Sequence, residues 1–297
     1  MRILVAVDKN PYSVYAVRQV AELARNTWAN VTLLCIGDQS PPENQNVDTL
    51  LKTEGIVHDL ANLLYSYSEK FLSCFEDADL LYGTHSSGYH LVREKKGILS
   101  LDYSGQPGRK VLDLRIRFGN ASKEILAESA ETGADLIVVG CNPEEECRWP
   151  TDTGIPGKVV KNASCSVLVI KEEKQPQMIV CCLDHDTISQ ASIELINQLV
   201  TLYHAELEII GVTGVNGLKA DVDRRMARIL AYYTSRNINA WVKLVDSPSL
   251  NTFIAQAAEK NLVAVWTGKQ SFLDKIFSRK HLEDLATTAE SSVLILR

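Results

Sequence analysis

RILVAVD, residues 2–8, is a short apolar run that ends in an aspartate, and the chain repeats it as MIVCCLD at residues 178–184. Three more apolar runs return in the same order: VTLLCI (31–36) as LEIIGV (207–212), ADLIVVG (134–140) as KNLVAVW (260–266), and SVLVI (166–170) as SVLIL (292–296). Runs of this length predict buried strands. Their recurrence predicts that one folding unit occurs twice in the chain.

Stretches with helical periodicity separate these strands, which predicts βαβ units and a parallel sheet covered on both faces. In the first such stretch, Asn10 suits the helix N-cap and Pro11 the first helical position. We therefore expect an α/β protein with two tandem doubly wound domains, each a five-stranded parallel sheet. The domains are expected at 1–173 and 174–297, joined by the charged stretch KEEKQPQ (171–177).

The periodicity also gives approximate bounds for the elements. Besides the two Asp-terminated strands, strands are expected at 31–36, 111–117, 135–139, 166–170, 206–212, 239–245, 262–266 and 292–296. After the helix that begins near Pro11, helices are expected at 48–76, 121–132, 155–163, 189–203, 219–236, 250–260 and 281–290.

The first half is longer than the second because of an insertion at about 78–109, ADLLYGTHSSGYHLVREKKGILSLDYSGQPGR. Its alternating apolar and polar residues around two turn signals predict a β-hairpin or a flap. Three arrangements fit this pattern: an intermolecular arm, a lid, or a hairpin packed on its own domain.

Composition narrows the class of protein. The 297 residues are about twice the usual domain length. A net charge of −6 argues against a nucleic-acid surface, which needs a concentrated basic face. No apolar run approaches the ~18 residues of a membrane span, and the N-terminus does not suit a signal peptide. Seven scattered cysteines favour a reducing compartment, so we expect a cytoplasmic protein.

The loop after the run ADLIVVG carries the next signal. It keeps the spacing Gly140, two residues, Pro143, nine residues, Thr153 and Gly154, and KVVKNASCSVLVI (158–170) follows it. With the Asp-terminated first strand in both halves, the chain resembles a tandem universal stress protein. The resemblance implies an adenine-nucleotide alpha-hydrolase-like fold, a contact between the last strands of the two copies, and a role in the stress response.

The resemblance also implies a ligand, which is ATP or another adenine nucleotide. Carried over to this sequence, the expected binding residues are Asp8, Ile36, Gly140, Asn142, Thr153, Gly154 and Ile155. The physical basis is general, because backbone N–H groups in a glycine-rich turn and at a helix N-terminus form an anion site.

Departures from the family pattern leave two interpretations open. Pro143 lacks an N–H, and the run Glu144–Glu146 places negative charge where phosphates would lie. Arg148 and Lys158 favour an anion, so the loop is either a nucleotide site or a solvated connector. In the second half the corresponding positions are Trp266, Lys269, Arg279 and Lys280, without a glycine, so we expect no nucleotide site there.

Other reactive side chains form no catalytic set in the sequence. Cys141, Cys147 and Cys165 lack the spacing of a zinc site and are predicted to be buried small apolar residues. His85 and His90 are predicted to be loop residues. We therefore expect no metal and no enzymatic activity.

The predicted function is that of a cytoplasmic stress-response regulator that binds protein partners or forms a homodimer, with a small anionic ligand in the first half. An alternative is a scaffold that binds no nucleotide and acts through protein–protein contacts. Slow ATP hydrolysis is a third hypothesis, although no base or metal pair supports it. Neither a nucleic-acid partner nor a membrane span is expected.

Overall fold

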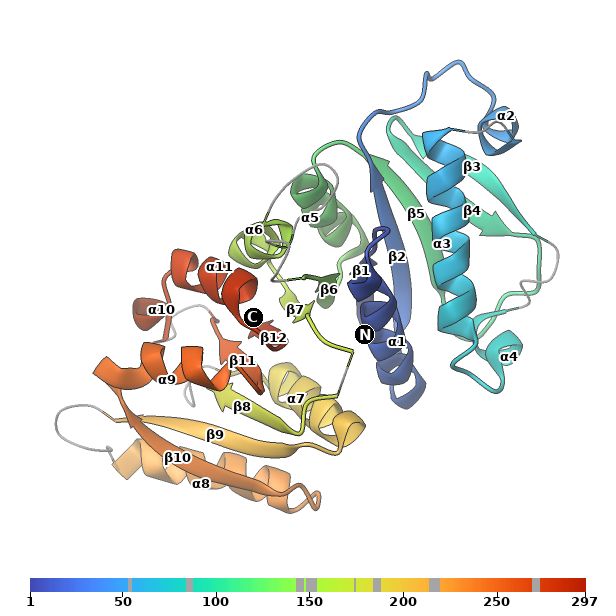
Figure 1. The fold of residues 1–297 in the computed structure, drawn as a ribbon. Helices are drawn as coiled ribbons and strands as arrows, with labels where there is room; N and C mark the ends of the chain where they lie inside the picture. The colour runs from blue at the N-terminus through green and yellow to red at the C-terminus, as the bar shows by residue number, and fades with distance from the viewer. Residues whose placement is uncertain are drawn as a thin grey trace.

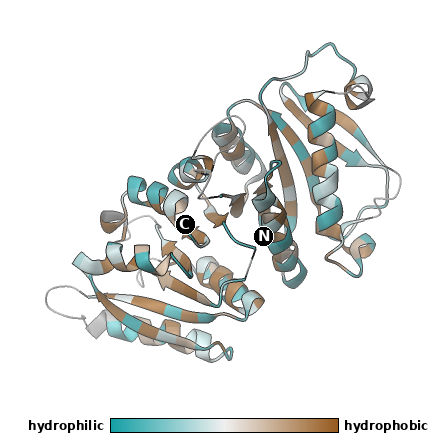
Figure 2. Ribbon diagram, viewed as in Figure 1, coloured by the Kyte–Doolittle hydropathy of each residue, from teal (hydrophilic) through white to brown (hydrophobic). Residues whose placement is uncertain are grey.

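The computed structural model describes residues 1–52, 55–83, 88–142, 147, 154–173, 175–183, 188–213, 220–268 and 273–297. These residues form one twelve-stranded sheet with the order β10-β9-β8-β11-β12-β7-β6-β1-β2-β5-β4-β3. Helices cover both faces of the sheet (Figure 1). Apolar residues are concentrated along the strands, whereas the helices also carry polar residues (Figure 2).

The first half contains five parallel strands in the order β7-β6-β1-β2-β5. These strands are β1 (Arg2–Ala6), β2 (Asn30–Gly37), β5 (Leu112–Phe118), β6 (Leu136–Gly140) and β7 (Ser166–Ile170). β6 and β7 are buried along their whole length, as continuous apolar runs in a doubly covered parallel sheet should be.

The helices of the first half are α1 (Pro11–Asn26), α2 (Val47–Lys52), α3 (Ile56–Leu72), α4 (Ala78–Tyr82), α5 (Ala121–Thr132) and α6 (Ile155–Asn162). Asn10 is the N-cap of α1, as predicted. The single helix predicted at 48–76 is wrong, because the structure has α2 and α3 there. Gly55 is the N-cap of α3, and a glycine is poorly suited to a helix interior.

The second half repeats the parallel unit in the order β10-β9-β8-β11-β12. Its strands are β8 (Met178–Cys182), β9 (Glu206–Thr213), β10 (Ala240–Asp246), β11 (Leu262–Trp266) and β12 (Val293–Leu296). Its helices are α7 (Gln190–Tyr203), α8 (Ala220–Thr234), α9 (Leu250–Ala257), α10 (Leu273–Ile276) and α11 (Arg279–Thr288), with a short 3₁₀ helix, η2 (Ser247–Ser249).

The two parallel units meet at their last strands, where β7 pairs with β12 in antiparallel orientation. This confirms the expected contact between the two copies, and it joins their sheets into one. Helix α6 packs against α11 across the same boundary. A Cβ on Gly157 of α6 would lie 2.9 Å from Glu283 Cγ, so the two helices approach closely because position 157 is a glycine.

The insertion forms a hairpin on its own domain. β3 (Tyr89–Lys95) and β4 (Ile98–Tyr103) pair with each other, and β4 pairs with β5 in antiparallel orientation. Of the three arrangements, the structure therefore has the packed hairpin. Leu91, Leu99 and Leu101 are buried in the core, which explains why the segment orders as strands.

Charged side chains connect β3, β5 and α5. Arg117 Nε lies 2.5 Å from Glu128 Oε2, and Arg115 Nε lies 3.3 Å from Glu128 Oε1. Glu94 on β3 accepts a hydrogen bond from Arg115 at 2.9 Å. Burial opposes the charge of Arg117, but hydrogen bonds to Glu128 and two further glutamates of α5 raise its pKa above the usual value. This network holds the hairpin against α5.

Candidate functional site

The strand order places the candidate site at one edge of the first half. β1 leads to β2 on one side, whereas β6 lies on the other, so the topological switch point lies between β1 and β6. Ligands in open α/β sheets bind outside the carboxyl ends of the strands at this point. Ala6 pairs with both Leu34 and Val139, so Asp8, Ile36 and Gly140 reach the same edge.

Asp8 is buried, and its carboxylate is already hydrogen-bonded within the chain. Oδ1 accepts from Asn10 N at 3.0 Å and from the Ser13 hydroxyl at 2.7 Å. Oδ2 accepts from Asn10 Nδ2 at 2.7 Å and from the Tyr12 hydroxyl at 2.8 Å. Four donors on two oxygens leave this carboxylate little capacity for a ligand.

Tyr12 also occupies the switch point itself. Its side chain is 3% exposed, and a Cβ placed on Gly140 would overlap its ring. Gly140 therefore lets the aromatic ring approach the end of β6, where a phosphate-binding glycine would admit a ligand. Tyr67 donates to the Asp8 carbonyl at 2.8 Å, and burial, reinforced by the negative charge of Asp8, raises the pKa of Tyr67 to about 12.

The other expected binding residues lie around the loop after β6. Ile36 and Asn142 are half-buried, whereas Ile155 is fully buried in the core and offers no surface to a ligand. Thr153 lies outside the described residues, as do the other distinctive residues of the loop: Pro143, Glu144–Glu146 and Arg148.

Gly154 is the part of this region that best suits an anion. It is the N-cap of α6, with φ 62° and ψ 30°, and no heavy atom of the described residues lies within 4 Å of the position that a Cβ would take. The left-handed conformation explains the glycine, and the N-terminus of a helix favours negative charge. The conformation of Gly154 thus suits an anion, whereas the Tyr12 ring packs against Gly140.

Cys141 and Cys147 are buried, as predicted, but they form a disulfide bond and are not two separate small apolar side chains. Cys147 N also donates to Asn142 O at 2.9 Å. The five intervening residues matched no common zinc spacing, and sequence reasoning gave no reason to join the two thiols. The remaining described cysteine of that prediction, Cys165, is half-buried and contacts Ser129 at 3.4 Å.

We expect the substitution Cys147→Ala to lower the free energy of unfolding by about 2 kcal/mol, because closing a loop this short restricts the unfolded chain modestly. Urea denaturation with and without a thiol reductant measures the effect. Reductant should destabilise the wild-type protein by a similar amount and leave Cys147→Ala unchanged. Cys165→Ala is the control, which should remain as sensitive to reductant as the wild-type protein.

An aromatic residue stands at the corresponding strand end of the second half. Trp266 ends β11, at the position of Gly140 in the first half, and its indole is 4% exposed. The ring folds over Gly268, where a Cβ would overlap it. Arg279 and Lys280 are exposed at the start of α11. Asp184, His185 and Lys269 lie outside the described residues.

Other functional classes find little support in the described part of the chain. No group of three or more His, Cys, Asp or Glu side chains there is arranged to hold a metal ion. His90 is exposed on β3, not in a loop as predicted, and His85 is outside the described residues. Among the described helices, none combines the length and the apolarity needed to span a bilayer.

The strand order, with its switch point between β1 and β6, defines an adenine-nucleotide alpha-hydrolase-like α/β fold. The profile of the Universal stress protein family matches residues 1–171, and the chain belongs to that family.

Solved structures share the fold at low sequence identity. A universal stress protein from Archaeoglobus fulgidus DSM 4304 is 12% identical, with a TM-score of 0.61, over 100% of this chain and 96% of that one. A putative universal stress protein from Pseudomonas aeruginosa UCBPP-PA14 is 15% identical, with a TM-score of 0.53, over 99% of this chain and 92% of that one. No curated protein sequence matches the chain significantly.

The residues that sequence reasoning missed are those around Asp8. Asn10 was assigned as a helix cap, but its side chain makes no capping hydrogen bond and donates to Asp8 instead. Tyr12 and Ser13 belong to no sequence motif, so the sequence did not single them out. The available signal was their position within one turn of Asp8, since polar side chains there can reach a strand-end carboxylate.

Proposed function

We propose that the protein is a non-catalytic stress-response regulator that acts through protein contacts, with the nucleotide crevice of its first half closed. The proposal rests on the position of the Tyr12 side chain, which fills the switch point and donates a hydrogen bond to Asp8. The degenerate second half supports it, because Trp266 occupies the equivalent position. The domains extend over 1–173 and 174–297 in this proposal.

A second candidate is a regulator that binds ATP or another adenine nucleotide in the first half. The left-handed Gly154 at the N-terminus of α6 favours this candidate. Nucleotide binding would then require Tyr12 to leave the crevice and free the Asp8 carboxylate. A ligand can produce that change only if it binds the open state more tightly than the closed one.

A test of ATP binding distinguishes the two candidate functions. We expect the purified protein to contain no nucleotide by native mass spectrometry, and Mg²⁺ with ATP to leave its thermal unfolding unchanged. A ligand present at 100 times its Kd would stabilise the fold by about 2.7 kcal/mol, which a thermal shift detects readily.

Variants of Tyr12 and Gly154 show whether any observed ATP binding takes place in the crevice of the first half. Tyr12→Phe keeps the ring but removes one donor to Asp8, so it should also fail to bind ATP. Tyr12→Ala removes the ring, and a gain of binding in this variant alone supports a closed crevice. Nucleotide retained by the wild-type protein, and lost in Gly154→Val, would overturn the first candidate in favour of the second.

A further inference from the structure

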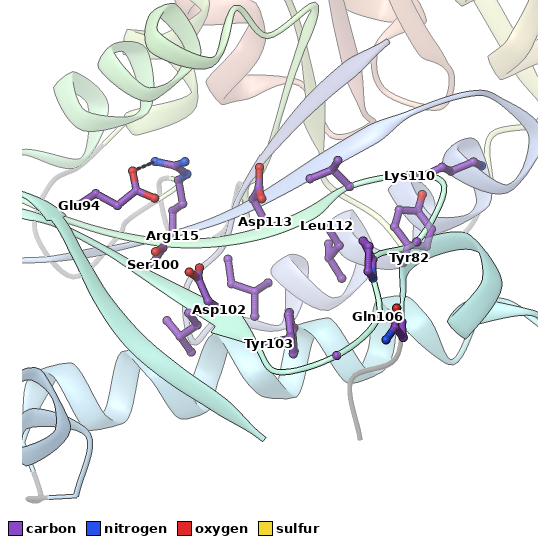
Figure 3. Close-up of a pocket in the computed structure, with 16 residues that line it drawn as sticks. Tyr82, Glu94, Ser100, Asp102, Tyr103, Gln106, Lys110, Leu112, Asp113 and Arg115 are labelled. Atoms are coloured by element: carbon purple, nitrogen blue, oxygen red, sulfur yellow. Dashed lines mark hydrogen bonds and ion pairs between the residues drawn. The ribbon is translucent and has the colours of Figure 1, made fainter. Parts of the chain in front are cut away.

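The strands β4 and β5 are paired over only part of their length. Their ladder ends at the pair Ser100–Arg115, although β4 continues to Tyr103 and β5 begins at Leu112. Figure 3 shows the two strands separating beyond this pair, with side chains from both around the opening. A cavity of about 340 Å³ lies there, and residues of the connection between β4 and β5 line part of it.

Hydrogen-bond acceptors without partners line one end of this cavity. The carboxylates of Asp102 and Asp113 lie on neighbouring strands, and neither accepts a hydrogen bond from the described residues. Ser100 lines the same cavity and is only 6% exposed, yet its hydroxyl has no partner within the described part of the chain. The Ser100 hydroxyl is therefore available to a group bound in the cavity.

The basic side chains nearby are engaged elsewhere. Arg115 donates to Glu94 at 2.9 Å and lies 3.3 Å from Glu128. Lys110 directs its ammonium group to the carbonyls of Ala24 and Thr27, at 2.7 and 2.9 Å. The cavity therefore presents two carboxylates with no cation directly bonded to them.

The half-buried carboxylate of Asp113 also has an unfavourable electrostatic environment. Burial raises the pKa of Asp113, and Glu94 on β3, Asp102 on β4 and Glu128 on α5 add to this effect against Arg115 on β5. A positive charge placed between Asp102 and Asp113 would relieve the repulsion.

We propose that this cavity binds a small organic cation, an alkylamine or a guanidine, whose N–H groups donate to Asp102, Asp113 and Ser100. The acceptors match an ammonium or guanidinium group, which has several donors and no acceptor. A metal ion is a poorer match, since the described residues contain no cluster of three potential ligands. The volume lies at the lower end of the range for small-molecule sites.

Isothermal titration calorimetry of the full chain with spermidine tests the proposal, at an ionic strength of about 0.15 M to screen nonspecific attraction to an acidic protein. We expect Asp113→Asn to weaken binding at least about 10-fold, because it removes a charge-assisted hydrogen bond. Ser100→Ala should weaken it less. The matched control is Asp223→Asn, which makes the same change on an exposed position of α8 and should bind as the wild-type protein does.

Two further probes identify the source of the cation. N-acetyl-lysine amide stands for a lysine side chain of a protein partner, and 1,4-butanediol is an uncharged analogue that should not bind. If the lysine derivative binds more tightly than spermidine, and Asp113→Asn weakens it, the natural occupant is a partner's side chain. The proposal is overturned if neither amine binds, or if Asp113→Asn and Asp223→Asn change the affinity equally while both variants remain folded by circular dichroism.

Discussion

The substitution Glu128→Ala is expected to lower the free energy of unfolding by about 3–5 kcal/mol, because it removes one partner of a buried ion pair. The Glu128 carboxylate is completely buried, and the Arg117 side chain is only 4% exposed. Without Glu128, Arg117 and Arg115 would share a poorly solvated region with less negative charge. Urea denaturation followed by circular dichroism measures the change.

Glu131→Gln is the matched control on the same helix. Glu131 also pairs with Arg117 and with Lys95, but its side chain is 43% exposed, so solvent screens both pairs. We expect a cost of at most about 1 kcal/mol. A cost for Glu128→Ala no larger than that of Glu131→Gln would show that the network does not hold the hairpin against α5.

The large cost expected at Glu128 depends on a contact that sequence reasoning could not place. The apolar runs and their repetition predicted the five parallel strands of each half, since burial on both faces of a parallel sheet requires such runs. Arg115 and Arg117 alternate with Leu114 and Ile116 along β5, and alternation alone indicates a solvated face. Only the position of α5 relative to β5 shows that these arginines are paired with glutamates.

The sequence predicted where the candidate site lies, but not whether it is open to a ligand. The strand-end position of Asp8 and the glycine of the run ADLIVVG place both residues at the carboxyl edge, and the structure confirms that placement. Whether the edge is open depends on the Tyr12 rotamer and on the hydrogen bonds of Asp8. These are tertiary contacts with no periodic signal, so the sequence left the nucleotide site and the solvated connector as equal alternatives.

Aromatic rings from different elements pack at the strand ends of the two halves. Tyr12 comes from the first turn of α1, whereas Trp266 comes from the end of β11. A duplicated unit that kept a common ligand would be expected to keep a common crevice. The different solutions support a function in which neither crevice needs to stay open, and they leave the outer surfaces and the hairpin as the places for binding.

Lys171 is expected to make the stability of the protein depend on pH above neutrality. Its ammonium group donates to the carbonyls of Thr287, at 3.2 Å, and of Ala289, and so joins the end of β7 to the end of α11. Burial lowers the pKa of Lys171 to about 7, with Glu172 opposing the shift. In the unfolded chain the pKa of a lysine is about 10.4.

The sign of the effect follows from proton binding. Between the two pKa values the unfolded state holds a proton on Lys171 that the folded state lacks, so stability rises with pH by about 1.4 kcal/mol per unit. From pH 7 to 9 the contribution amounts to nearly 3 kcal/mol, and below pH 7 it is flat. Urea denaturation at pH 7, 8 and 9 measures it.

Comparison with Lys171→Met isolates this contribution from other groups that titrate in the same range, such as buried tyrosines. The difference in unfolding free energy between the wild-type protein and Lys171→Met should change by about 1.4 kcal/mol per pH unit in favour of the wild-type protein. Lys123→Met, at an exposed position of α5, should show no such change. Parallel pH profiles for Lys171→Met and the wild-type protein would mean that Lys171 remains charged in the folded state. Lys171 would then contribute no pH dependence to the free energy of unfolding between pH 7 and 9.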